Sequence, residues 1–324
     1  MHPLVERLRG ALLPAVVTPM DRHGVVDHDA LADYAVRVAE GPVGGVAVWA
    51  HTGRGLHLSE DDRSRVLATW RQATAAPLVA GVGVPRAVTA PDPGRAADAT
   101  VAMAVRAAEL GADAVMVYPV AALGALPDGH DRAVRLHERV AAESGLPLVG
   151  FYLHGEAGGY PYPPELVREL LALPSMLGIK TATLDRAIGC QDAIWAARGT
   201  GKLTITGEDR MFGPSLMWGA DTALVGIAAA RADLTADVMR AWAAGDHTAF
   251  VAASDRLDRF AAVTFLAPIE GYVQRMMWAA AHEGLLPEDA AHDPYGPPLP
   301  AAERAAVVAR LDALSPASGR PARR

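Results

Sequence analysis

The chain of 324 residues carries a net charge of −7, is 51% hydrophobic and contains one cysteine, Cys190. The interspersed charges argue against binding to nucleic acid or to an anionic membrane, and a single cysteine excludes an intrachain disulfide framework. Its apolar runs are too short to cross a membrane, and the first residues, MHPLVERLRG, show no apolar signal segment, so we expect a cytoplasmic protein.

Short apolar runs recur eight times along the chain, at 12–19, 44–50, 77–83, 113–119, 146–152, 176–182, 203–207 and 222–227. Segments with helical spacing lie between them, among them 28–40, 59–74, 99–110, 131–144 and 163–173. Continuous apolar runs of this length that alternate with helices are typical of parallel strands buried on both faces. Eight such units predict an α/β fold, a (β/α)8 TIM barrel.

The rest of the chain reads as helices. We expect a barrel at residues 1–230, a C-terminal helical extension at 231–315 that packs on it, and a disordered tail at 316–324. The segment 87–100 lengthens the loop after the third strand, and we expect it to shape the entrance of the pocket.

Polar side chains follow most of the predicted strands, where a TIM barrel has its active site. They are Thr18, His51, Thr52, Gly53, Arg54, Tyr118, Tyr152, His154, Lys180, Thr181, Gly207, Glu208 and Asp209. No third metal ligand accompanies His51 and His57, and GVGVPR (81–86) is an incomplete dinucleotide loop. We therefore expect no metal and no cofactor.

Lys180 is one of only two lysines in the chain and ends the sixth apolar run. Burial favours the neutral amine and lowers the pKa of a lysine, and a neutral amine attacks ketones and aldehydes to form an iminium. The alternative is a lysine that only extends from the barrel rim into solvent. Tyr152 suits proton transfer or simple packing, and Thr52-Gly53 suits either a carboxylate site or a bare turn.

Taken in order, the motifs resemble the dihydrodipicolinate synthase / N-acetylneuraminate lyase superfamily of Schiff-base-forming barrels, from about residue 11 to about 300. The segments that carry the resemblance are LLPAVVTPMDRHGVVDHDALADYA, GVAVWAHTGRGLHLSEDDRSRVL, AAELGADAVMVYP, PLVGFYLHG, LGIKTATLD and ITGEDRMFGPSLMWGADTALVG. The resemblance implies that Lys180 forms the Schiff base and that Tyr152 relays protons. It also implies that a 2-keto acid's carboxylate lies against Thr52 and Gly53, with Gly207 and Leu224 lining the same pocket.

The sequence departs from the family pattern at the loop after the second strand, where His51 and Arg54 replace a hydroxyl residue and a glutamate. Val120 and Ala121 replace a tyrosine pair of the lysine-biosynthesis enzyme, and Ala157 stands about where that enzyme has an arginine for a second carboxylate. These changes argue against dihydrodipicolinate synthesis itself. His51 suits general acid–base work near neutral pH, or alternatively only shapes the rim.

The resemblance thus implies a class I lyase or aldolase that acts on a 2-keto acid, pyruvate or a pyruvate-yielding substrate, through a Lys180 iminium and an enamine. Dehydration of a 2-keto-3-deoxy sugar acid by the same iminium is the alternative reaction. A non-catalytic binding or regulatory barrel is the alternative of another class. The family also implies a homo-oligomer, a tetramer or a dimer.

Overall fold

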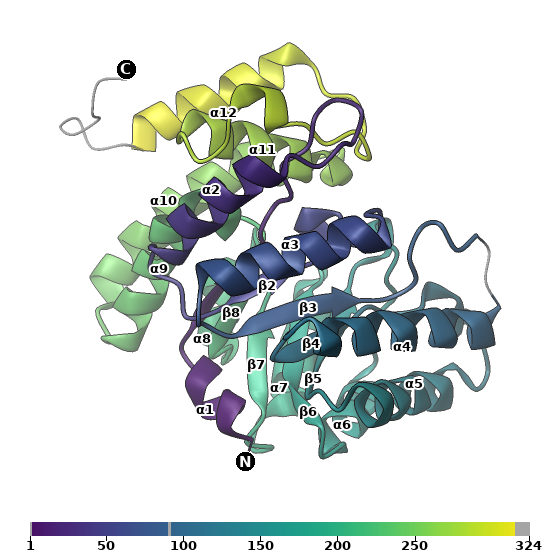
Figure 1. The fold of residues 1–324 in the computed structure, drawn as a ribbon. Helices are drawn as coiled ribbons and strands as arrows, with labels where there is room; N and C mark the ends of the chain where they lie inside the picture. The colour runs from purple at the N-terminus through teal and green to yellow at the C-terminus, as the bar shows by residue number, and fades with distance from the viewer. Residues whose placement is uncertain (1, 90–91, 315–324) are drawn as a thin grey trace.

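Residues 2–89 and 92–314 are described by a computed structural model, in which eight parallel strands form a barrel (Figure 1). The strands follow the order β1-β8-β7-β6-β5-β4-β3-β2, and a bridge between Ala15 and Ala47 joins β1 to β2. Their bounds are β1 Leu12–Pro14, β2 Val46–Val48, β3 Leu78–Val82, β4 Ala114–Val117, β5 Leu148–Leu153, β6 Met176–Ala182, β7 Leu203–Thr206 and β8 Thr222–Val225. The predicted TIM barrel is confirmed.

The strands are buried on both faces, which explains their continuous apolar sequence. Inward side chains such as Val149, Phe151 and Leu224 form a core inside the barrel. Outward ones such as Leu148 and Tyr152 pack in a larger core beneath the helices. Neighbouring residues of one strand therefore point to opposite faces, and only the inward residues face the interior and the mouth of the barrel.

Helices alternate with the strands as predicted: α2 His28–Ala39, α3 Glu60–Ala73, α4 Pro93–Glu109, α5 Gly129–Ser144, α6 Pro164–Ala172, α7 Ala187–Ala197, α8 Phe212–Trp218 and α9 Ala228–Ala243. A short N-terminal helix, α1 Pro3–Leu8, was not predicted. Asp92 caps α4 by accepting hydrogen bonds from the backbone of Gly94 and Arg95. Much of the predicted 87–100 insertion is thus the first part of α4, while residues 90–91 lie outside the described residues.

Beyond α9 the chain forms α10 His247–Thr264, α11 Tyr272–His282 and α12 Ala301–Leu314, which pack together beside α2 and α9 (Figure 1). The large core runs without interruption from Leu12 in β1 to Leu311 in α12. A division at residue 230 stays a prediction, and the predicted tail at 316–324 lies outside the described residues. No described helix combines the length and the apolar character that a membrane crossing requires.

Arg275 in α11 holds the segment before that helix in place. It is fully buried; its Nη1 donates to the Leu266 oxygen at 2.8 Å, and its Nε donates to Glu303 at 2.7 Å. Phe265, Ile269 and Tyr272 in this part of the chain line a pocket at the barrel mouth. The C-terminal helices therefore contribute to the site as well as to the core.

Candidate active site

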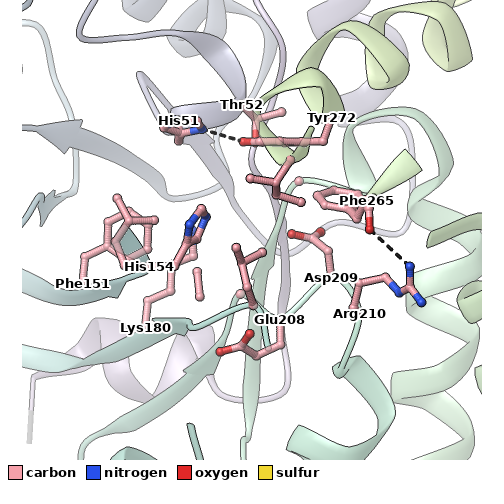
Figure 2. A pocket seen from close by; sticks show the side chains of 16 residues that line it. His51, Thr52, Phe151, His154, Lys180, Glu208, Asp209, Arg210, Phe265 and Tyr272 are labelled. Atoms are coloured by element: carbon pink, nitrogen blue, oxygen red, sulfur yellow. Dashed lines mark hydrogen bonds between the residues drawn. The ribbon is translucent and has the colours of Figure 1, made fainter. Parts of the chain in front are cut away.

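A pocket opens at the C-terminal ends of β5, β6 and β7, with about 560 Å³ of empty space including the part open to solvent. Lys180 and Asp209 both border it, and His51, Thr52 and Tyr272 border it on the side away from Lys180 (Figure 2). Four of the seven residues predicted for the site line this pocket, namely His51, Thr52, Lys180 and Gly207.

Lys180 projects inward from β6, a strand of seven residues, and is only 6% exposed. Its Nζ lies 4.2 Å from the centre of the Phe151 ring, which faces it from β5. Burial lowers the pKa of Lys180 to about 8, although the negative charges of Asp209 and Glu208 oppose this effect. A substantial fraction of the amine is therefore neutral, and nucleophilic, near neutral pH.

Gly207 makes room for the lysine. A Cβ at this position would lie 2.3 Å from Lys180 Cε, 2.5 Å from the Thr181 oxygen and 3.2 Å from the Leu224 oxygen. Only glycine leaves the space through which the lysine side chain reaches the pocket. Leu224 itself is fully buried in the barrel core, so only its backbone approaches the site.

Two adjacent acids after β7 have different roles. Glu208 is 2% exposed, and its carboxylate accepts hydrogen bonds from the Thr183 backbone at 2.8 Å and the Thr183 hydroxyl at 3.0 Å. It joins the loops that follow β6 and β7. Asp209 accepts the Ile227 N–H at 2.8 Å, and burial raises its pKa to about 7 against the pull of that bond and of Lys180. Asp209 is thus able to exchange a proton near neutral pH.

Tyr152 does not line the pocket that contains Lys180, and its implied role in proton relay stays a prediction. The strand register pairs Phe151 with Lys180 and Tyr152 with Thr181, so the phenol lies on the outer face of β5. There its ring stacks on Tyr162, with centroids 5.5 Å apart, and its hydroxyl approaches Gly189 of α7. It borders a separate surface hollow that also contains Arg186.

A different phenol occupies the pocket. Tyr272 Oη lies 2.9 Å from His51 Nδ1 and 3.1 Å from Thr52 Oγ1 (Figure 2). The Tyr272 ring stacks on Phe265 at 4.8 Å and lies nearly parallel to the His51 ring at 5.8 Å. Burial raises the pKa of Tyr272 well above its usual value, so the phenol stays protonated and is able to donate a hydrogen bond.

Charged groups fix this side of the pocket to the C-terminal segment. Arg54 is 3% exposed and binds Asp293 through Nη2 at 2.7 Å and Glu270 through Nη1 at 2.8 Å. The other carboxylate oxygen of Glu270 lies 3.3 Å from His51 Nε2. Burial raises the pKa of Glu270, but His51 and Arg54 outweigh this and hold it at about 2. Arg54 is thus a buried cation that joins the loop after β2 to the C-terminal segment through ion pairs.

Gly53, the remaining predicted residue, lies beside the pocket and is held by the Thr18 hydroxyl, which donates to its carbonyl oxygen at 2.8 Å. Glu270 and Tyr272 were not predicted, because nothing in IEGY relates these residues to His51, which lies 221 positions before Tyr272. Over residues 2–89 and 92–314, no three His, Cys, Asp or Glu side chains come together in a group that could hold a metal ion.

Comparison with known proteins gives one family. Residues 8–314 match the model of the dihydrodipicolinate synthetase family. A 4-hydroxy-tetrahydrodipicolinate synthase of Stenotrophomonas maltophilia is 28% identical over 317 residues, 94% of this chain and 98% of that protein. An uncharacterized lyase of Halobacterium salinarum is 27% identical over 247 residues, 73% of each chain.

Solved structures share the fold at lower identity. A prophage protein of the dihydrodipicolinic acid synthase family from E. coli K12, in complex with pyruvate, superposes with a TM-score of 0.80 at 19% identity, over 94% of this chain and 98% of that chain. The sialic acid aldolase of Ruminococcus gnavus superposes with a TM-score of 0.78 at 19% identity, over 95% and 97%.

Proposed function

The chain belongs to the dihydrodipicolinate synthetase family and is a lyase, and on that premise we propose that it forms an iminium between Lys180 and a 2-keto acid. The observation that carries this proposal is the buried amine of Lys180 at the mouth of the barrel, with its pKa lowered to about 8. A solved relative is described with pyruvate bound, and another as a mutant of its catalytic lysine. Pyruvate, or a substrate that yields it, is therefore the first candidate.

The bond changes follow from the amine. The nitrogen of neutral Lys180 attacks the keto carbon, the carbonyl oxygen takes up protons and leaves as water, and a positively charged iminium remains. In the cleavage direction, a base removes the proton of the C4 hydroxyl and the C3–C4 bond breaks. Its electron pair forms the enamine, and an aldehyde leaves. Protonation of C3 and hydrolysis then release pyruvate and restore Lys180.

The carboxylate of the keto acid fits the side of the pocket that Thr52 and Gly53 border. Thr52 offers a hydroxyl, whereas the N–H of Gly53 already donates to the Ala50 oxygen at 3.0 Å. Gly207 and the backbone at Leu224 complete the floor beside Lys180. Small carboxylates are bound by hydroxyl and backbone N–H donors. This placement puts the keto carbon between Thr52 and the lysine nitrogen.

The reaction is proposed to differ from dihydrodipicolinate synthesis. The side chain at position 157 is alanine, which provides no positive charge for a second carboxylate. Leu153, Leu184, Phe265 and Ile269 give the pocket an apolar rim instead. Such a rim favours apolar contacts with the distal half of the substrate, beside the one guanidinium that Arg210 adds to the pocket. Dehydration of a 2-keto-3-deoxy sugar acid by the same iminium remains the alternative reaction, and a non-catalytic barrel the alternative of another class.

Trapping tests this function. The protein is incubated with pyruvate and with a panel of other 2-keto acids, reduced with borohydride, and digested for mass spectrometry. We expect a stable adduct on Lys180 and none on Lys202, the only other lysine, whose Nζ donates to the Met176 oxygen at the opposite end of β6. Failure to modify Lys180 with every acid of the panel would exclude a Schiff-base enzyme.

If an adduct forms on Lys180, a second assay distinguishes an aldolase from a dehydratase. The acids that form adducts are assayed for release of an aldehyde and, separately, for loss of water. Aldehyde release identifies an aldolase, and water loss identifies a dehydratase. An adduct without turnover of any acid supports the binding barrel. The cytoplasmic location and the homo-oligomer remain proposals, and light scattering on the purified protein tests the latter.

A further inference from the structure

We propose that Tyr272 from the C-terminal helices is the proton-transferring phenol of this enzyme, and that it works in a relay with His51 and Glu270. The inference rests on the proposed function, since it assigns the group that moves protons to and from the substrate held on Lys180. Tyr272 and Lys180 line the same pocket from opposite sides (Figure 2). The relay is therefore built from two parts of the chain that the barrel alone does not bring together.

The geometry determines which atom carries each proton. Glu270 is ionised, because Arg54 and His51 keep its pKa low, and an ionised carboxylate only accepts hydrogen bonds. His51 Nε2 lies 3.3 Å from Glu270 Oε1, in an ion-pair contact without a hydrogen bond, and a lone pair on this nitrogen would face the negative oxygen, so the proton of neutral histidine belongs on Nε2. In neutral histidine this leaves Nδ1 free to accept the hydroxyl proton of Tyr272 across 2.9 Å.

The hydroxyl of Thr52 completes the arrangement. Because the Tyr272 proton points to His51, Thr52 donates to Tyr272 Oη across 3.1 Å. The phenol oxygen keeps a further lone pair for the substrate. The single proton of Thr52 therefore orients the phenol while the substrate site is empty, and it turns to the carboxylate when the keto acid binds.

The proton transfer balances without forming a phenolate. When the iminium loses a proton from C3, Tyr272 Oη accepts that proton and passes its own hydroxyl proton to His51 Nδ1. The C3–H electron pair becomes the C2=C3 double bond of the enamine, and the C2=N pair returns to the lysine nitrogen. The imidazolium that results faces the Glu270 carboxylate. The reverse transfer protonates the enamine.

The relay is held rigidly, as proton transfer requires. Tyr272 is 7% exposed, and its ring is stacked against Phe265. A Cβ on Gly226 would lie 2.9 Å from Thr52 Oγ1 and 3.2 Å from Tyr272 Cε2, so glycine is needed for the two groups to meet. Glu270 Oε1 is buried and makes no hydrogen bond to any part of the chain that the structure describes. The His51 imidazole is thus the charge partner that this oxygen faces.

The test separates iminium formation from proton transfer. Pyruvate is incubated with the protein in D₂O, and NMR follows the entry of deuterium into its methyl group, which requires the enamine. Borohydride trapping on Lys180 is measured in parallel. We expect Tyr272→Phe to trap pyruvate within a few-fold of the wild-type rate, and to exchange deuterium at least roughly 100-fold more slowly, the usual contribution of general acid–base catalysis.

Two further variants keep the proposal falsifiable if Tyr272→Phe does not fold. His51→Asn should trap pyruvate and lose exchange to a similar degree. Tyr152→Phe removes the same hydroxyl from the outer face of β5, and it should reduce exchange only a few-fold. If Tyr152→Phe abolishes exchange while Tyr272→Phe retains it, the relay is overturned.

Glu270 is a positioning residue and needs a readout of its own. The groups that act on His51 and Tyr272 besides Glu270 are Arg54, His57, His154 and Asp209. We measure the exchange rate divided by the trapping rate as a function of pH, a ratio that cancels the titration of Lys180. In Glu270→Gln this ratio should fall, because the imidazolium formed in the relay has lost its counter-charge, and Glu270→Asp, which keeps the charge, should restore part of it. An unchanged ratio in Glu270→Gln contradicts the role of Glu270.

Two further outcomes distinguish failure of the proposed function from failure of the relay. If the wild-type protein traps no 2-keto acid, the proposed function fails and the relay fails with it. If wild type and the Tyr272 and His51 variants trap and exchange alike, the relay alone is overturned and the Schiff base stands.

Discussion

The two sides of the pocket are built in different ways. The amine wall, Lys180, Gly207 and Asp209, comes from β6 and the loop after β7, and the register of the sheet positions it. The phenol wall, His51, Thr52 and Tyr272, joins the loop after β2 to the start of α11, and residues 221 positions apart meet there. Arg54, Glu270 and Asp293 hold this second wall through ion pairs.

The difference indicates a division of labour. A strand end buries an amine and thereby makes it nucleophilic, which is the requirement for forming an iminium. A network of hydrogen bonds and ion pairs orients a phenol and an imidazole, which is the requirement for moving protons. Changes in the amine wall should therefore stop the Schiff base, and changes in the phenol wall should leave it intact but slow the steps that follow.

The largest effect is expected from Lys180→Met. Without the amine no iminium forms, so adduct and turnover should both fall below detection. The matched control is Lys202→Met, which removes the other lysine from the far end of the barrel and should keep the wild-type adduct. Mass spectrometry of the borohydride-treated proteins measures both. An adduct that persists in Lys180→Met would place the chemistry on another group.

Gly207→Ala should have the next largest effect. The new Cβ would lie 2.3 Å from Lys180 Cε, so the lysine must move. A displacement of about 1 Å costs roughly 100-fold in rate, and we expect trapping to slow by that amount. Gly155→Ala, where a Cβ meets nothing within 4 Å, is the control and should trap normally. Equal trapping rates for the two variants would contradict the tight fit at Gly207.

Arg54→Met tests the phenol wall. The change leaves Asp293, whose side chain is fully buried, without its partner, and breaking such a pair costs about 3–5 kcal/mol. Unfolding in urea measures this loss, and Arg139→Met, in an exposed ion pair, should show no resolvable change. In the folded fraction we expect deuterium exchange to fall about 10-fold, as for a weakened general acid–base step, while trapping changes little. A selective loss of trapping would instead show that the phenol wall is also needed to form the iminium.

The smallest effect concerns pH. Because burial lowers the pKa of Lys180 to about 8, the trapping rate should rise with pH, pass its midpoint near 8 and then level off. Asp209 opposes the lowering, so Asp209→Asn should move the midpoint to lower pH. A midpoint at the ordinary value of an exposed lysine, about 10.4, would show that the amine is not buried.

Most of the amine wall could be predicted from the sequence. Seven of the eight strands lie within the predicted apolar runs and β5 extends one residue beyond its run, because strands buried on both faces have a continuous apolar sequence. Lys180 stands out at the end of one such run for the same reason. The inward direction of a side chain was harder to predict. In FYLHG both Phe151 and Tyr152 suit a barrel interior, and a register irregularity between Leu148 and Val149 precedes them. A shift of one residue exchanges the two faces.

Only the part of the phenol wall that follows β2 could be predicted from the sequence. His51 and Thr52 follow a strand end and were recognised there, whereas Tyr272 begins a helix of the extension. Its role depends on how α11 packs over the barrel, which in turn depends on the buried contacts of Arg54 and Arg275. Local spacing in the sequence does not predict such contacts between distant segments.

One measurement tests the division of labour most directly: a crystal structure of the protein trapped with pyruvate and borohydride. We predict a covalent bond from Lys180 Nζ to the former keto carbon, the carboxylate beside Thr52, and the methyl carbon directed to the hydroxyl of Tyr272. An adduct whose methyl carbon is directed away from Tyr272 and reaches Tyr152 through a rearranged β5, or an adduct on Lys202, would contradict the account.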